Sequence, residues 1–181
     1  VENLMERQNR SVLLLFGINL LVLTLLGYVN SRLGGYGFFL YAPGLFFLPG
    51  ALYLDNLRGM PLAFLTGLML DQMVESSFGF HAFVLCLLHL LGSKWVRGSN
   101  YRKALSPIFF QVSVNLFFFV AWLLWIKIFG DEFLDWTMGR WVGDLVVSSL
   151  ILVPLAIWMP QLCRKLLVIA KSHPLEIADP R

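Results

Sequence analysis

Three ionisable side chains, Asp71, Glu75 and His81, lie within or beside two hydrophobic runs that occupy residues 61–95. Together they could hold a metal ion or supply the base of an intramembrane hydrolase. A carboxylate at the centre of a membrane helix costs about 2.5–3.5 kcal/mol on insertion scales, so such a group normally faces protein or trapped water and marks an interior or functional surface. We therefore expect Asp71 to face the interior of the protein.

The sequence does not contain the further residues that either a hydrolase or a metal site would need. A hydrolase needs a nucleophile beside a base, and the sequence contains no GxSxG, HExxH, Walker A or CxxCH motif. His81 and His89 are eight residues apart, which turns a helix by about 80° beyond two full turns and gives no common metal-binding face. We expect no catalytic residue, no metal ion and no cofactor, and we expect His81 to cap or orient a turn by hydrogen bonding.

Two further polar pairs interrupt hydrophobic runs in the second half of the chain. Gln111 and Asn115 have i, i+4 spacing, as do Asp144 and Ser148, so each pair shares one helical face. Polar contacts between membrane helices contribute only about 0.6 kcal/mol on average. We therefore favour a role for these four residues in fixing helix register inside a bundle, with a polar ligand cavity as the alternative.

The composition is that of an integral membrane protein. The 181 residues are 58% hydrophobic and 14% charged, with a mean hydropathy of +0.73, whereas about 25% of residues are charged in soluble domains. A net charge of +3 does not indicate nucleic-acid binding, because the basic residues lie at the ends of the hydrophobic runs and form no large patch. Cys86 and Cys163 are expected to pack in the core.

Six hydrophobic runs predict an all-α, polytopic membrane protein with one compact six-helix bundle. The spans are expected at residues 11–29, 37–54, 61–75, 79–96, 104–128 and 141–163, within a single transmembrane domain of residues 1–181. With the N-terminus in the cytoplasm, eleven of the fourteen Lys and Arg residues fall on the cytoplasmic side, so both termini are expected there. The basic tail at 164–181 should lie at the cytoplasmic lipid interface. Because the chain opens on Val1 rather than Met, we expect further residues upstream.

The second, third and fourth spans have features that ordinary lipid-facing helices lack. The third and fourth are short, so neighbours must cover them, and we expect a tight central hairpin that turns at residues 75–78. Ala63 and Gly67 would let another backbone approach the third span closely. Pro-Gly pairs at 43–44 and 49–50 must kink or break the second span, either as a packing feature, which we favour, or as part of a substrate site.

The connection between the fifth and sixth spans is acidic and flanked by aromatic residues. Residues 130–140 contain three carboxylates, and Trp125, Trp136 and Trp141 stand where an aromatic belt is expected. This loop is a candidate periplasmic contact surface, although short acidic outer loops often have no specific role.

The pattern of Gly67 and Asp71, a short polar stretch, and then Gly79 and His81 before a second apolar helix resembles the core motif of the MreD family of rod shape-determining membrane proteins. The resemblance implies a non-enzymatic scaffold of the bacterial cell-elongation complex in the inner membrane. Its partners would be MreC and, directly or through the complex, the actin-like MreB, the glycosyltransferase RodA and a class B penicillin-binding protein. The four motif residues would then belong to the packed hairpin and to a possible partner surface.

Glu75 and the doubled Pro-Gly pairs depart from that pattern. They leave open a substrate-binding subunit of a vitamin transporter of the energy-coupling-factor type, which has a similar size and six helices, and whose fold the MreD family is thought to share. A cavity lined by Asp71, Asn115 and Asp144 would favour that alternative, whereas a filled bundle would favour the scaffold.

Overall fold

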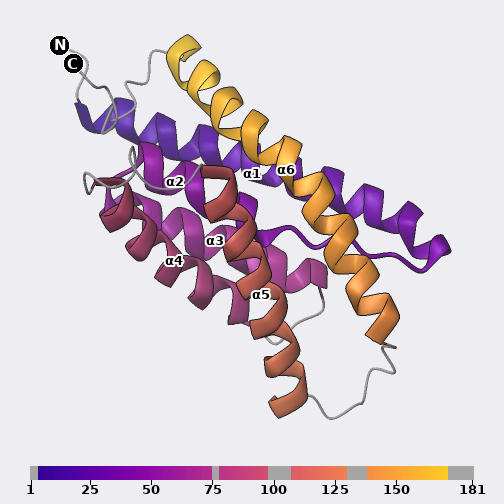
Figure 1. Ribbon diagram of the computed structural model, residues 1–181. Coiled ribbons are helices and arrows are strands. Elements are labelled where there is room, and N and C mark those ends of the chain that lie inside the picture. The colour runs from indigo at the N-terminus through magenta and orange to yellow at the C-terminus, as the bar shows by residue number, and fades with distance from the viewer. Residues whose placement is uncertain (1–3, 75–77, 98–106, 130–137, 171–181) are drawn as a thin grey trace.

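The computed structural model describes residues 4–74, 78–97, 107–129 and 138–170, and Figure 1 shows the arrangement of their helices. These residues contain helices and no strand, which confirms the predicted all-α fold with six helices. The elements are α1 Leu4–Leu33, η1 Gly34–Tyr36, η2 Pro43–Leu45, α2 Phe47–Tyr53, α3 Asn56–Val74, α4 Phe80–Arg97, α5 Pro107–Phe129 and α6 Met138–Ile169.

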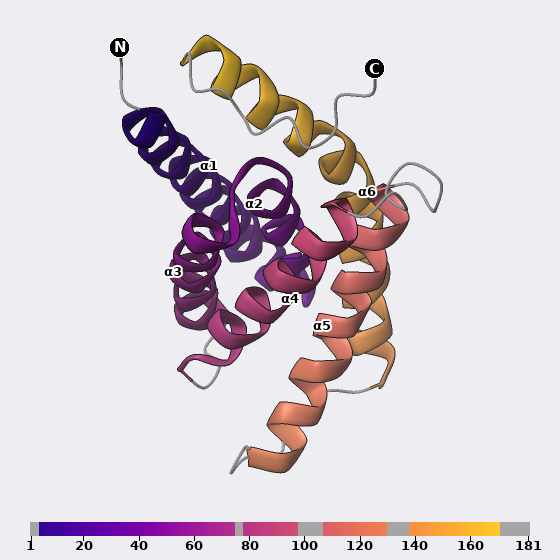
Figure 2. The same cartoon turned by 90° about the vertical axis from the view of Figure 1, so that its left-hand side faces the viewer.

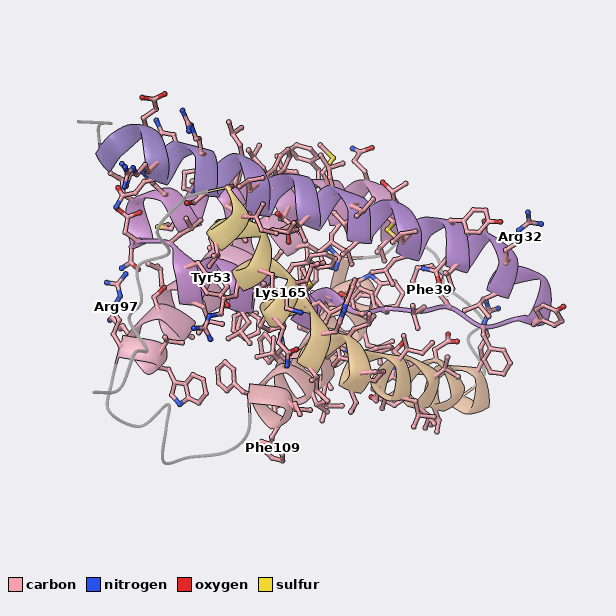
Figure 3. The ribbon with its side chains drawn as sticks, turned by 90° about the horizontal axis from the view of Figure 1, so that it is seen from above. Arg32, Phe39, Tyr53, Arg97, Phe109 and Lys165 are labelled. Atoms are coloured by element: carbon pink, nitrogen blue, oxygen red, sulfur yellow. The ribbon has the colours of Figure 1, made fainter. Side chains whose placement is uncertain are left out.

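Two of the described helices are long and apolar enough to cross a membrane by length and composition alone. They occupy Glu6–Tyr36 and Gly139–Ile169, and shorter apolar helices occupy Pro43–Tyr53 and Ile108–Leu124. Figure 1 shows the first turn of α1 and the last turn of α6 at the same end of the bundle. Arg97 lies at this end too, whereas Arg32 lies at the opposite end (Figure 3).

The longest helix, α6, is bent rather than straight, as Figure 2 shows. It contains two prolines, Pro154 and Pro160, and continues through both of them to Ile169. Each proline removes a backbone donor and crowds the preceding turn, so a bend is the expected result.

The second hydrophobic run is only partly helical. The backbone is extended or irregular from Phe38 to Ala42, then forms the short η2 turn and the seven-residue helix α2. The break lies at Pro43, because a residue that precedes proline is kept out of the helical region. Pro49 lies in the first turn of α2, where its missing N–H interrupts no hydrogen bond. Of the two Pro-Gly pairs, only the first therefore breaks the helix.

Helices α3 and α4 form an antiparallel hairpin whose backbones approach closely (Figures 1 and 2). Gly67 lies at the point of closest approach, since a Cβ atom placed on it would overlap the backbone of Ala82 and lie 2.7 Å from the carbonyl carbon of His81. Ala63, one turn earlier, is 5% exposed. Helix α3 starts at Asn56 rather than near residue 61, so Pro61 lies inside it.

Substituting Gly67 by valine should separate α3 from α4, because the new side chain would collide with backbone that cannot move aside. We expect a loss of about 1–3 kcal/mol or more, as for overpacked cores. Gly17 in α1 is the matched control, since no atom lies within 4 Å of a Cβ placed there. Thermal unfolding of the detergent-solubilised variants measures the difference, and a Gly67→Val melting temperature equal to that of Gly17→Val would contradict this packing.

Candidate functional site

The Asp71 carboxylate, near the end of α3, binds the first residues of α4. Its Oδ2 accepts a hydrogen bond from the Gly79 backbone N–H at 2.9 Å, and its Oδ1 accepts one from the His81 backbone N–H, also at 2.9 Å. The first N–H groups of a helix have no partner within the helix, and the partial positive charge there favours an anion. Asp71, which is 2% exposed, is thus a cap for α4 supplied by the preceding helix.

Gly79 gives the chain the conformation that this capping needs. Its φ is +94°, a left-handed value that side chains with a Cβ rarely adopt. No atom lies within 4 Å of a Cβ placed on Gly79, so the backbone angle rather than lack of space selects glycine there. The angle directs the N–H groups of Gly79 and His81 toward the same carboxylate.

The His81 ring links the Asp71 carboxylate to Tyr41, which lies in the extended segment at residues 38–42. Its Nδ1 lies 2.8 Å from Asp71 Oδ1, and its Nε2 lies 2.5 Å from the Tyr41 hydroxyl oxygen. Because a carboxylate only accepts, Nδ1 carries the proton, and in the neutral ring Nε2 accepts the Tyr41 O–H. The hydrogen bonds therefore run from Tyr41 through His81 to Asp71.

Aromatic rings enclose the three linked side chains. The ring of Phe118 stacks on His81 with centroids 5.8 Å apart, and Phe119 meets Tyr41 edge-on at 4.9 Å. Tyr41 and Asp71 are each 2% exposed and His81 is fully buried. The polar atoms of these three side chains are thus withdrawn from the surface, and they join α3, α4 and the extended segment.

The extended segment at residues 38–42 is held by side chains from α1, α5 and α6. Phe39 N–H donates to Asp144 Oδ1 at 2.8 Å, and Tyr41 N–H donates to Ser148 Oγ at 2.9 Å. Leu40 exchanges two hydrogen bonds with the amide of Asn30, its N–H donating to Oδ1 at 2.7 Å and its C=O accepting from Nδ2 at 2.9 Å. Residues 40–42 are buried and the segment belongs to no helix or strand, so these side chains provide hydrogen bonds that its backbone requires.

Asn115 holds the end of the same segment. Its Nδ2 donates to the Tyr41 C=O at 3.2 Å, and its Oδ1 accepts from the Gly44 N–H, also at 3.2 Å. Gly44 lies against α5, since a Cβ placed on it would come within 2.7 Å of the Gln111 carbonyl oxygen. Asn115, Asp144 and Ser148 thus converge on residues 39–44 and not on one another. Gln111 is fully buried, and its side-chain amide has no hydrogen-bond partner in the part of the chain that the structure describes.

Sequence reasoning missed Asn30 and Tyr41. Asn30 directly follows the first hydrophobic run and precedes Ser31 and Arg32, so its position resembles that of an ordinary polar span end, and Tyr41 lies two residues before the first Pro-Gly pair. A polar residue in the middle of the same run was an available signal for Asn19. Its Nδ2 donates to Thr66 Oγ1 at 3.0 Å, which joins α1 to α3.

Several predicted features lie outside the described residues. These are Glu75, the acidic residues and Trp136 of the loop between α5 and α6, the Trp125 side chain, and the tail after residue 170. Trp141 is described and is half-buried. Among the described residues no group of three or more His, Cys, Asp or Glu side chains could hold a metal ion.

Replacing Asp71 by alanine should destabilise the hairpin, because the buried His81 N–H, the half-buried Gly79 N–H and the His81 ring would lose their acceptor. Each orphaned group costs about 1–3 kcal/mol. Gln72→Ala, at the exposed next position, is the control. Folded yield and thermal unfolding in detergent are the measurements. If Asp71→Ala melted at the same temperature as Gln72→Ala, the capping role would be wrong.

Asn115→Leu should weaken the attachment of the extended segment to α5, since it leaves the Tyr41 C=O and the Gly44 N–H without partners. A free-energy loss of about 1 kcal/mol or more per orphaned group is expected. Ser113→Leu, at an exposed position on the same helix, should be nearly neutral. Comparing the unfolding midpoints of the two variants decides whether Asn115 serves the backbone, and equal midpoints would show that it does not.

The comparisons with known proteins identify the family through its sequence model. The model described as rod shape-determining protein MreD matches residues 38–166, more than two thirds of the chain. No curated protein and no solved structure gave a match. The matched region contains Gly67, Asp71, Gly79 and His81, the residues that form the capped hairpin. The chain therefore belongs to the MreD family of rod shape-determining membrane proteins.

Proposed function

We propose that this protein is a non-enzymatic scaffold of the bacterial cell-elongation complex, which binds MreC and helps to couple peptidoglycan synthesis to the MreB cytoskeleton. RodA and a class B penicillin-binding protein are further partners, reached directly or through the complex. The observation that carries the proposal is the family match over residues 38–166, because it makes this chain a rod shape-determining membrane protein.

The apolar surface supports a location within a bilayer. Large apolar side chains are exposed on five of the helices, among them Leu13 (70%), Phe83 (70%) and Leu150 (69%). Water would oppose an apolar surface of this extent, whereas lipid tails are as apolar as the side chains themselves. Buried polar side chains such as Asn30, Asp71 and Asp144, in contrast, form hydrogen bonds inside the bundle.

The distribution of basic residues supports an inner-membrane protein that crosses the bilayer several times with both termini in the cytoplasm. The first turn of α1, the last turn of α6 and Arg97 share one end of the bundle (Figures 1 and 3). Cytoplasmic ends of membrane proteins carry an excess of Lys and Arg. Eleven of the fourteen Lys and Arg residues belong to this end in the proposed topology.

The buried site supports a scaffold rather than an enzyme. Asp71, His81 and Tyr41 use their polar atoms to join α3, α4 and the extended segment. Nothing among the described residues or in the comparisons favours the vitamin-transporter subunit. Asn115 and Asp144, which would line a substrate cavity in that alternative, contact the backbone of residues 39–44.

Affinity purification of the tagged, full-length protein in mild detergent should recover MreC, identified by mass spectrometry. An unrelated membrane protein with the same tag is the control for non-specific recovery. Recovery of a transmembrane coupling subunit with paired ATPases, and of no cell-wall protein, would contradict the scaffold proposal and favour a transporter subunit.

A further inference from the structure

Two prolines, Pro154 and Pro160, divide helix α6 into two segments. Each proline lacks the N–H that would donate to the carbonyl four residues earlier, and proline is a common cause of sharp kinks in helices. In Figure 2 the first part of α6 lies alongside α5, and the helix then bends away from α5. The backbone of α6 is therefore least supported at residues 154–160, between a first segment at 138–153 and a second segment at 161–169.

Hydrogen bonds attach the two ends of this bend to different parts of the bundle. In the first segment, Asp144 and Ser148 accept from backbone N–H groups of the extended segment at 2.8 and 2.9 Å. Where the second segment begins, the Pro160 carbonyl oxygen accepts from the hydroxyl of Tyr53 at 3.0 Å. Tyr53 is the last residue of α2. The first segment is thus bonded to the extended segment, and the start of the second is bonded to α2.

The second segment packs its inner face on the bundle through apolar side chains. Cys163 and Leu167 are fully buried, whereas Val168 and Ile169 are 61% and 76% exposed. Lipid tails are as apolar as these side chains, so packing on the bundle gains little from the hydrophobic effect. An acyl chain can replace the apolar contacts of Cys163 and Leu167, but it offers no acceptor for the Tyr53 hydroxyl.

We propose that α6 is hinged at residues 154–160 and that the Tyr53 hydroxyl is the latch that holds residues 161–169 against α2. When its hydrogen bond to Pro160 breaks, the second segment turns outward and exposes Cys163, while the first segment keeps its bonds to the extended segment. In the topology proposed above this end of α6 is cytoplasmic. The hinge thus lets the cytoplasmic end change shape without disturbing the capped hairpin, which goes beyond the scaffold role.

The test follows the reaction of the native thiols with N-ethylmaleimide in the purified full-length protein in mild detergent, read by peptide mass spectrometry. Tyr53→Phe removes the hydroxyl and keeps the ring. It should speed the labelling of buried Cys163 by about two- to tenfold, the factor that corresponds to one neutral hydrogen bond. The half-buried Cys86 of α4 should react at an unchanged rate. Tyr28→Phe, at an exposed position of α1, should change neither rate.

A further thiol separates a hinged helix from one that detaches as a whole. Leu152→Cys places it at a fully buried position before the first proline. Its labelling rate should be the same with and without Tyr53→Phe, because the first segment stays in place. If this thiol and Cys163 both reacted faster in Tyr53→Phe, α6 would move as one piece and the hinge would be wrong. An unchanged rate at Cys163 would show that Tyr53 is not a latch.

Discussion

The structure depends on one constraint, which is that backbone N–H and C=O groups need hydrogen-bond partners where water is absent. A helix satisfies this requirement internally, and among the described residues side chains satisfy it at the start of α4 and at residues 38–42. At the start of α4 the N–H groups bond to the Asp71 carboxylate, and at residues 38–42 the backbone bonds to Asn30, Asp144 and Ser148. The hydrogen bond between Tyr41 and His81 joins these two places. The burial of Asn30, Asp71, Asn115, Asp144 and Ser148 is explained by these backbone groups.

The functional consequence is a bundle whose central part is fixed from several sides. Gly67 brings α3 and α4 into backbone contact, and the extended segment is attached to α1, α5 and α6 through side chains. Deforming the hairpin would expose paired polar groups to an apolar environment at a cost of about 1–3 kcal/mol each. A rigid centre suits the scaffold proposed above, in which the outward apolar faces and the two ends of the bundle would contact lipid and other proteins.

Much of this architecture follows from the sequence, for identifiable reasons. The six helices follow from the hydrophobic runs, and the interior position of Asp71 follows from the cost of a carboxylate in lipid. The sequence also indicates a break at the first Pro-Gly pair. It does not reveal that residues 38–42 are extended, because the side chains that support them, such as Asn30 and Asp144, lie 10 and 105 positions away from their partners. It also expects Gln111 to join a polar contact, whereas no partner is found for its amide among the described residues.

Hydrogen–deuterium exchange of the intact protein in a lipid nanodisc tests the central claim most directly. The amides of Phe39, Leu40, Tyr41 and Gly44 are bonded to side chains rather than to helical carbonyls. The amides of Leu40, Tyr41 and Gly44 should exchange as slowly as those in the middle of α3 and α4, because their bonds are buried and open only with the bundle. Rapid exchange of these three amides, at the rate of a solvent-exposed loop, would contradict the account.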